Sequence, residues 1–199
     1  MTHFYRNGTI SGAVDRERMN TQKIARYGLL TSMMLVLGLV ERQFLLVPGI
    51  PGIRLGLSNT VLLYAICLMG GKGAWLLMGL KVLLGGLLYA GVSGMMYSFA
   101  GGLLSMAAML LAVRVRGFGM VGISVSGAVT HMIGQLLMSR VLLGSWAAFV
   151  QAPLLLAAAV VTGVLNGVVA HAACRGIAQG NPDMRRRLKT LGLSERSKP

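Results

Sequence analysis

The stretch that decides the fold covers residues 149–173 and reads FVQAPLLLAAAVVTGVLNGVVAHAA, with no Asp, Glu, Lys or Arg in it. A helix needs roughly 20 apolar residues to cross the hydrocarbon core of a bilayer, with a range of about 17–25. This run therefore predicts a membrane-spanning helix. Five other apolar runs precede it along the chain, and the six together cover residues 24–40, 55–69, 74–89, 95–113, 118–143 and 149–173.

The composition of the whole chain points to the same class of protein. Of its 199 residues, 55% are hydrophobic and 12% are charged, whereas a soluble domain carries about 25% charged residues. These values exclude an ordinary soluble enzyme, and they exclude a disordered chain, because disordered segments are poor in apolar residues. We therefore expect an all-α, polytopic membrane bundle of six transmembrane helices.

Positive charge lies mainly in the two tails and in the short connections between apolar runs. The chain has 19 Lys and Arg against 5 Asp and Glu. Cytoplasmic segments of membrane proteins are enriched in Lys and Arg, so this distribution predicts a multi-pass protein of the cell membrane with both termini in the cytoplasm. It also argues against a nucleic-acid partner, the other common reason for a basic chain.

Three parts of the chain follow from this pattern. They are a polar cytoplasmic tail (1–23), a six-helix membrane domain (24–175) and a basic cytoplasmic tail (176–199) that we interpret as lying on anionic headgroups. The weakest boundary is Gly70-Gly71-Lys72-Gly73, which predicts either a tight inner turn or a break between two half-spans. Cys67 and Cys174 are expected near the inner ends of two spans, as reduced packing residues.

Lys81 is the sharpest functional signal, because it lies near the middle of the third apolar run. A Lys at the centre of a membrane helix costs roughly 2.5–3.5 kcal/mol on insertion scales. One interpretation is that the flexible stem carries the ammonium toward a headgroup. The other is that the charge faces a polar cavity and pairs with a carboxylate or an anionic ligand.

Glu41 is the only acid between residues 18 and 182. It is either a solvated helix end or the group that orients Lys81, Arg140 or Arg54 across an outer cavity. His131 and Gln135 are four residues apart and so share one helix face. They either form an interhelical hydrogen bond that packs the bundle or offer a ligand a donor and an acceptor one turn apart.

The polar side chains of the membrane domain gather at its outer half or at mid-depth. Arg42, Arg54, Lys81 and Arg140 face a single acid, so the outer cavity is expected to be net positive and to attract anions. The chain has too few His and acidic residues for a metal site, and no cofactor is expected. The expected substrate-binding residues are Lys81, Arg54, Asn59, Tyr97, His131, Gln135, Glu41 and Arg140.

Small residues recur at spacings that let membrane helices approach closely. We expect Gly85-Gly86, Gly101-Gly102 and Gly163-x-x-x-Gly167 to pack helices within the bundle. The same packing role is expected for Gly28-x-x-x-Ser32, with docking of a partner helix as the alternative for this first span.

Three strings of sequence carry a family resemblance, and they cover residues 48–59, 97–105 and 127–136: PGIPGIRLGLSN, YSFAGGLLS and GAVTHMIGQL. Together they resemble the bacterial Gx transporter family, also labelled heptaprenyl diphosphate synthase component I, over about residues 24–175. That family is similar to the six-helix S components of energy-coupling-factor vitamin transporters. In those proteins, a solute binds in the outer half, under the loop that joins the first two helices.

The resemblance also implies partners. In the S components, a small-xxx-small motif on the first helix meets a transmembrane coupling subunit driven by two ATPases. Gly28 and Ser32 would play that part here, although they depart from the alanine pair usual in the motif. Lys81 stands where the family is expected to have Arg.

The residues weigh against catalysis under either family label. Making a prenyl diphosphate requires clustered carboxylates that hold magnesium, and the hydrophobic body has one acid and no P-loop. We therefore expect a non-enzymatic protein of the cell membrane that binds and takes up a small anionic or vitamin-like solute. The alternative is a non-catalytic membrane subunit of heptaprenyl diphosphate synthase in isoprenoid or quinone synthesis.

Overall fold

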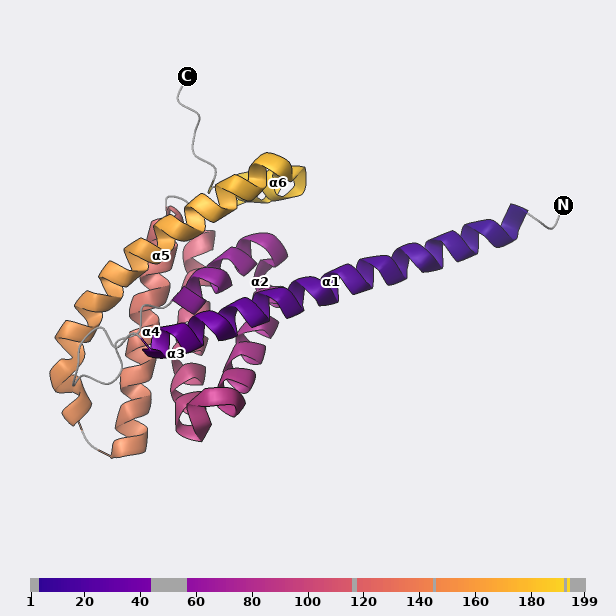
Figure 1. The fold of residues 1–199 in the computed structure, drawn as a ribbon. Coiled ribbons are helices and arrows are strands. Elements are labelled where there is room, and N and C mark those ends of the chain that lie inside the picture. The colour runs from indigo at the N-terminus through magenta and orange to yellow at the C-terminus, as the bar shows by residue number, and fades with distance from the viewer. Residues whose placement is uncertain (1–3, 44–56, 116–117, 145, 192, 194–199) are drawn as a thin grey trace, which may run out of the picture.

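The computed structural model of the chain describes residues 4–43, 57–115, 118–144, 146–191 and 193. Its regular structure in these ranges is entirely helical, which confirms the all-α prediction (Figure 1). The elements in chain order are α1 (Phe4–Gln43), α2 (Leu57–Gly85), the π-helical turn η1 (Gly86–Ala90), α3 (Gly91–Arg114), α4 (Met120–Leu143), the 3₁₀ turn η2 (Ala147–Gln151), α5 (Ala152–Gly180) and α6 (Pro182–Thr190).

Four helical stretches in the described ranges are long and apolar enough to cross a membrane. They are Thr21–Glu41, Ser58–Arg114, Met120–Leu143 and Phe149–Gly180. The chain is therefore a membrane-embedded protein. The second stretch has 57 residues, which is far more than the roughly 20 that one crossing needs, so its internal breaks decide how it is arranged.

The first break is Gly70, where α2 folds back on itself. Gly70 has φ 78° and ψ −179°, a backbone conformation that glycine adopts without steric cost. Lys81 and Asn59 are 22 residues apart in α2, yet their side chains are hydrogen-bonded at 3.1 Å. In a straight helix they would be about 33 Å apart. The structure therefore shows a turn at Gly70 that joins two antiparallel arms, 57–69 and 71–85.

The second break follows the π-helical turn η1. Gly91 has φ 68° and ψ −179°, and α3 begins there. The long apolar stretch thus consists of two arms of α2, the second extended by η1, followed by α3. With α1, α4 and α5, these segments correspond to the six apolar runs of the sequence, and we propose that each is one membrane crossing.

The bundle is apolar on its outer surface as well as in its core. Met34, Leu62 and Ile123 are among the fully buried side chains, while Leu87, Val92 and many similar residues on the outside are exposed. In water such a surface would aggregate, but in a bilayer it lies against lipid tails. The thiols of Cys67 and Cys174 are buried within hydrogen-bonding reach of each other, so α2 and α5 meet there as reduced packing partners.

Glycines bring α3, α4 and α5 into close contact, as their spacing predicts. A Cβ atom added at Gly163 or Gly167 would lie within 2.8 Å of backbone atoms of α4, so the Gly163-x-x-x-Gly167 packing prediction is confirmed. Gly134 of α4 lies similarly close to the backbone of α3 at Ala100 and Gly101. No such contact exists at Gly28, where an added Cβ atom would meet open space.

Helices continue through both expected tail boundaries. The 40 residues of α1 would measure about 60 Å, twice the roughly 30 Å of a hydrocarbon core. The N-terminal part of α1 accordingly extends beyond the bundle in Figure 1. At the other end of the chain, α5 continues to Gly180 and the short helix α6 packs against α5 and α2.

Basic residues of the described chain lie at the end of the bundle where the Gly70 turn, the last turns of α3 and the helix α6 come together. They are Lys72, Arg114, Arg175, Arg185, Arg186 and Lys189. The opposite end, near Gly91 and Gly144, has Arg140 as its described base. The positive-inside rule predicts that this basic end faces the cytoplasm.

We therefore predict that both termini are cytoplasmic. Alkaline phosphatase, which is active only outside the cytoplasm, should be inactive when fused after the C-terminus and active when fused after Gly144. A green fluorescent protein fused at the same two positions should give the reverse result. Phosphatase activity at the C-terminal fusion would overturn this topology.

Candidate functional site

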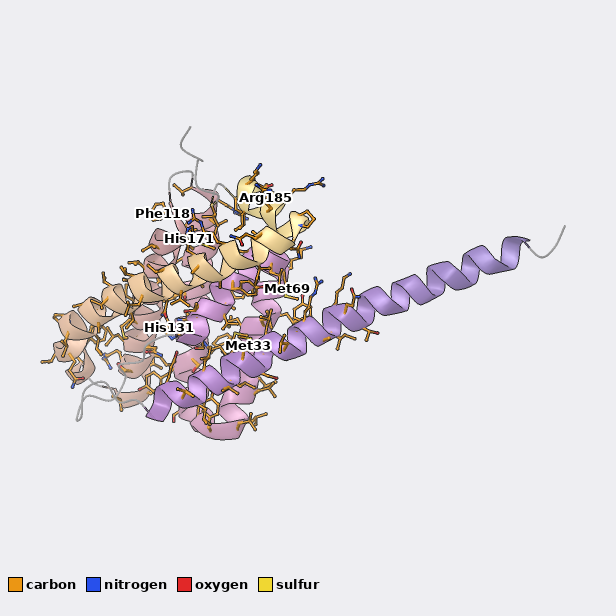
Figure 2. All side chains as sticks on the ribbon, turned by 45° about the horizontal axis from the view of Figure 1, so that its top comes forward. Met33, Met69, Phe118, His131, His171 and Arg185 are labelled. Carbon is orange, nitrogen blue, oxygen red and sulfur yellow. The ribbon has the colours of Figure 1, made fainter. Side chains whose placement is uncertain are left out.

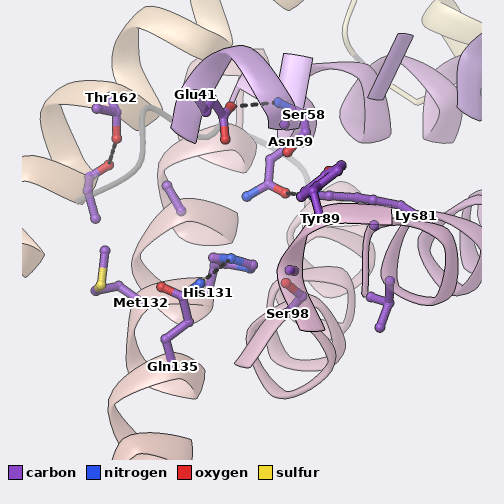
Figure 3. A pocket seen from close by; sticks show the side chains of 16 residues that line it. Glu41, Ser58, Asn59, Lys81, Tyr89, Ser98, His131, Met132, Gln135 and Thr162 are labelled. Carbon is purple, nitrogen blue, oxygen red and sulfur yellow. Dashed lines mark hydrogen bonds between the residues drawn. The ribbon is translucent and has the colours of Figure 1, made fainter. Parts of the chain in front are cut away.

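A polar cavity lies inside the apolar bundle, between α1, the two arms of α2, η1, α3, α4 and α5 (Figure 3). Its volume is about 60 Å³. Lining residues come from all of these segments, so the cavity depends on the turns at Gly70 and Gly91 that bring them together. Its polar lining consists of Glu41, Ser58, Asn59, Lys81, Tyr89, Ser98, His131, Gln135 and Thr162.

Lys81 reaches the cavity from the second arm of α2. Its Nζ atom donates a hydrogen bond to Oδ1 of Asn59 on the first arm, at 3.1 Å. Both side chains are partly buried. The amide oxygen thus provides part of the solvation that the ammonium loses in an apolar surrounding, and it holds the charge at the cavity wall.

Glu41 lies in the last turn of α1, and it is buried rather than solvated. Its Oε1 atom accepts a hydrogen bond from the backbone N–H of Ser58, at 3.0 Å. Ser58 lies in the first turn of α2, where backbone N–H groups have no partner within the helix. The carboxylate therefore caps α2 from α1, and the positive end of the helix dipole stabilises its negative charge.

His131 and Gln135 line the cavity from α4 and are hydrogen-bonded to each other, with 3.2 Å between their Nε2 atoms. The imidazole is held in place by the close approach of α3, because a Cβ atom added at Gly101 would lie 2.8 Å from His131 Cε1. The pair is thus a locally ordered polar edge, with a ring and an amide one turn apart on the same face (Figure 3).

Tyr89 enters the cavity from the π-helical turn η1. Its hydroxyl lies between α1 and α2, since Cβ atoms added at Gly38 and Gly85 would be 2.6 Å and 3.2 Å from Tyr89 Oη. Short π-helical turns occur frequently at functional sites. Here the turn directs a phenol toward the same cavity as Lys81.

Five of the eight expected substrate-binding residues line this cavity: Lys81, Asn59, Glu41, His131 and Gln135. Two others lie elsewhere in the described structure. Tyr97 is partly buried on α3 but is not in the lining, and the guanidinium of Arg140 stacks over the ring of Trp146, 5.0 Å from its centroid. Arg54 lies outside the described residues, as does the side chain of Arg42.

The expected substrate-binding residues did not include four polar residues of the lining: Ser58, Tyr89, Ser98 and Thr162. Ser98 is adjacent to Tyr97, and neighbouring residues on a helix point in different directions. Ser98 therefore lines the cavity, whereas the sequence predicted Tyr97 there. Ser58 similarly adjoins Asn59. Tyr89 carried no usable signal, because its direction depends on the π-helical turn.

The described residues offer little for metal or acid–base chemistry. In the ranges that the structure covers, no three His, Cys, Asp or Glu side chains gather in a group that could bind a metal ion. The described lining of the cavity holds one carboxylate and one ammonium. This set can recognise charged and polar groups, and it lacks the paired carboxylates that would hold magnesium on a diphosphate.

The sequence profile of the family described as heptaprenyl diphosphate synthase component I matches residues 30–173. The chain belongs to this family. The resemblance drawn from the sequence is thereby confirmed, and all lining residues of the cavity, from Gly38 to Thr162, lie inside the matched range.

No curated protein and no solved structure matches the chain. The function of the chain is therefore inferred from the component I family match and from the geometry of the cavity. The helix α6 and the first 29 residues lie outside the matched range.

Proposed function

We propose that this component I family member is an integral membrane protein that binds a small solute in the cavity around Lys81 and carries it inward. One observation supports this function above all: polar side chains from six segments converge on one cavity in an otherwise apolar bundle (Figure 3). Polar groups inside a membrane domain are costly, and they commonly mark substrate pathways.

The solute we propose carries an anionic group, such as a carboxylate or a phosphate, that would bind Lys81. The sequence predicted an excess of positive charge from Arg42, Arg54, Lys81 and Arg140. Of these four bases, Lys81 alone has a described side chain in the lining. Glu41 balances that charge while it caps α2. The described lining therefore suits a solute with one anionic group and further polar atoms, which His131 and Gln135 would bind.

Entry of a vitamin-sized solute requires the surrounding helices to move apart. The cavity of about 60 Å³ is much smaller than the roughly 300–1,000 Å³ of typical small-molecule sites. The Tyr89 hydroxyl lies between Gly38 of α1 and Gly85 of α2. We propose that a displacement of Tyr89 away from these glycines widens the cavity toward α1.

The second candidate function is a non-catalytic membrane subunit that works with a prenyl diphosphate synthase. The family description favours it, since it names a component of that enzyme. Co-purification with a soluble prenyl synthase, without any retained solute, would support this function. A retained water-soluble solute would support transport.

We further propose that α1 docks a transmembrane coupling subunit that two ATPases drive. An added Cβ atom at Gly28 would meet open space, and Ser32 is exposed, with its hydroxyl bonded to the Gly28 carbonyl at 2.9 Å. In contrast, the other small-residue pair, Gly163 and Gly167, is fully used inside the bundle. The Gly28 face of α1 is thus the small-residue face left open for another helix.

The test of the solute site is the substitution Lys81→Met, which keeps the length of the side chain and removes its charge. Stability should rise by about 1.5–2.5 kcal/mol, because removing a mid-span charge gains roughly 2.5–3.5 kcal/mol, while the lost bond to Asn59 costs about 1 kcal/mol. Solute binding should weaken by about 2–5 kcal/mol. Thermal unfolding in detergent and mass spectrometry of the solute retained by the purified protein measure the two effects.

Lys72→Met is the matched control, because Lys72 is exposed and lies beside the Gly70 turn, away from the cavity. It should change neither stability nor retention. If Lys81→Met retains the native solute as well as the parent does, the charge takes no part in binding and the anionic-solute proposal fails.

The docking proposal is tested by Gly28→Leu and Ser32→Leu. Both side chains fit into open space, so folding and solute binding should survive while uptake by whole cells is lost, because the added bulk blocks helix approach. Gly167→Leu is the contrasting variant: its Cβ atom would lie 2.6 Å from the Val121 Cα atom, and overpacking should unfold or destabilise the bundle. Full uptake by the Gly28→Leu variant, or loss of its folding, would contradict docking at this face.

A further inference from the structure

A second cavity lies at the basic end of the bundle, between the start of α4, the last turns of α5 and the helix α6. Its volume is about 570 Å³, within the roughly 300–1,000 Å³ of typical ligand sites. It lies on the far side of the membrane domain from the cavity around Lys81. His171 and Arg185, which line it, are labelled in Figure 2.

Three cationic side chains line this cavity: Arg175 from α5, and Arg185 and Lys189 from α6. Arg185 and Lys189 are four residues apart and share one face of α6. His171 and Gln179 add polar groups from the face of α5 that carries Arg175. None of the described lining residues is acidic, so these side chains give the cavity a positive potential.

The short helix α6 is held in an orientation that keeps its bases at this cavity. Met184 and Leu188 are buried, 1% and 6% exposed, and they anchor the apolar face of the helix. The side chain of Asn181 caps its start by accepting a hydrogen bond from the backbone N–H of Met184, at 3.3 Å. After the other end of the helix, the backbone N–H of Leu193 donates a hydrogen bond to the Leu188 carbonyl, at 2.9 Å.

The remaining walls are apolar, and they include Met120, Cys174, Leu188 and Leu193. Met120 is the first residue of α4, whose start has no side-chain cap, so the positive end of that helix dipole adds to the potential of the three bases. A cavity of this size is much larger than an inorganic anion. Its lining therefore suits a molecule with both an anionic group and an apolar part.

We propose that this cavity binds a phosphate or diphosphate group, carried by an amphiphile whose apolar part lies against Cys174, Leu188 and Leu193. Arg and Lys are the side chains that recognise phosphate oxygens through charge-assisted hydrogen bonds. A diphosphate carries enough negative charge to neutralise the three bases. This site is separate from the solute cavity, and the α6 side chains that complete it lie beyond residue 173, where the family match ends.

The test uses the full-length protein in nanodiscs of neutral phosphatidylcholine, with three probes: inorganic pyrophosphate, farnesyl diphosphate and phosphatidylglycerol added to the bilayer. We expect saturable binding of farnesyl diphosphate, weakened roughly tenfold or more by Arg185→Gln or Lys189→Gln, because each removes a charge-assisted hydrogen bond. Arg186→Gln removes the same charge from the same helix, but Arg186 does not line the cavity, and this variant should bind as the parent does.

The probes also identify the source of the phosphate group. Pyrophosphate that binds as tightly as farnesyl diphosphate identifies a soluble phosphate ligand, whereas competition by phosphatidylglycerol identifies a lipid headgroup. Lys81→Met should leave all of these affinities unchanged, so failure of the solute proposal and failure of this one are distinguishable. The proposal is overturned if none of the probes binds, or if Arg186→Gln weakens binding as much as Arg185→Gln does.

Discussion

The rest of the structure depends on the cost of placing the Lys81 ammonium in the middle of an apolar helix. A charge at this depth costs several kcal/mol unless polar atoms surround it. The bundle supplies such atoms from segments distant in sequence, and the Asn59 amide oxygen at 3.1 Å is the described hydrogen-bond partner. Keeping that contact requires α2 to fold back at Gly70, so one costly charge and one permissive glycine together determine the arrangement of the long apolar stretch.

The helices α3, α4 and α5 pack closely around this polar interior. Glycines 134, 163 and 167 let α3, α4 and α5 approach until their backbones touch. Glu41 then fixes the end of α1 to the start of α2, while the Gly28 face of α1 stays open. The two proposed roles of the chain therefore use different parts of it: the solute binds within the bundle, and the partner docks on the Gly28 face of α1.

Much of this arrangement could be predicted from the sequence, because apolar run length and charge position are read directly from residues. Apolar run length predicted the helical class, glycine spacing predicted the packing role of Gly163 and Gly167, and three sequence strings carried the family resemblance. At Gly70 the sequence left a tight turn and a break between half-spans as alternatives. The residues of the site were harder to predict from the sequence. The resemblance and mid-membrane polarity selected Lys81, Asn59, Glu41, His131 and Gln135, which do meet. Tyr97 and Arg140 do not line the cavity, since their directions depend on helix rotation and on the contact with Trp146. The role of Tyr89 depends on a π-helical turn, which no pattern of residues in the sequence predicts.

The central claim, that Lys81 is solvated inside the bundle and not at a headgroup, is tested most directly by a double-mutant cycle with Asn59. Unfolding free energies would be measured in bicelles for the parent, Lys81→Met, Asn59→Leu and the double variant. Asn59→Leu should destabilise the parent, because it leaves the ammonium short of an acceptor, yet it should be neutral or stabilising once Lys81 is Met. The coupling energy should be about 1–3 kcal/mol, the range of directly interacting groups. Equal effects of Asn59→Leu in both backgrounds would show that the ammonium lies in water or among headgroups, and would contradict the account.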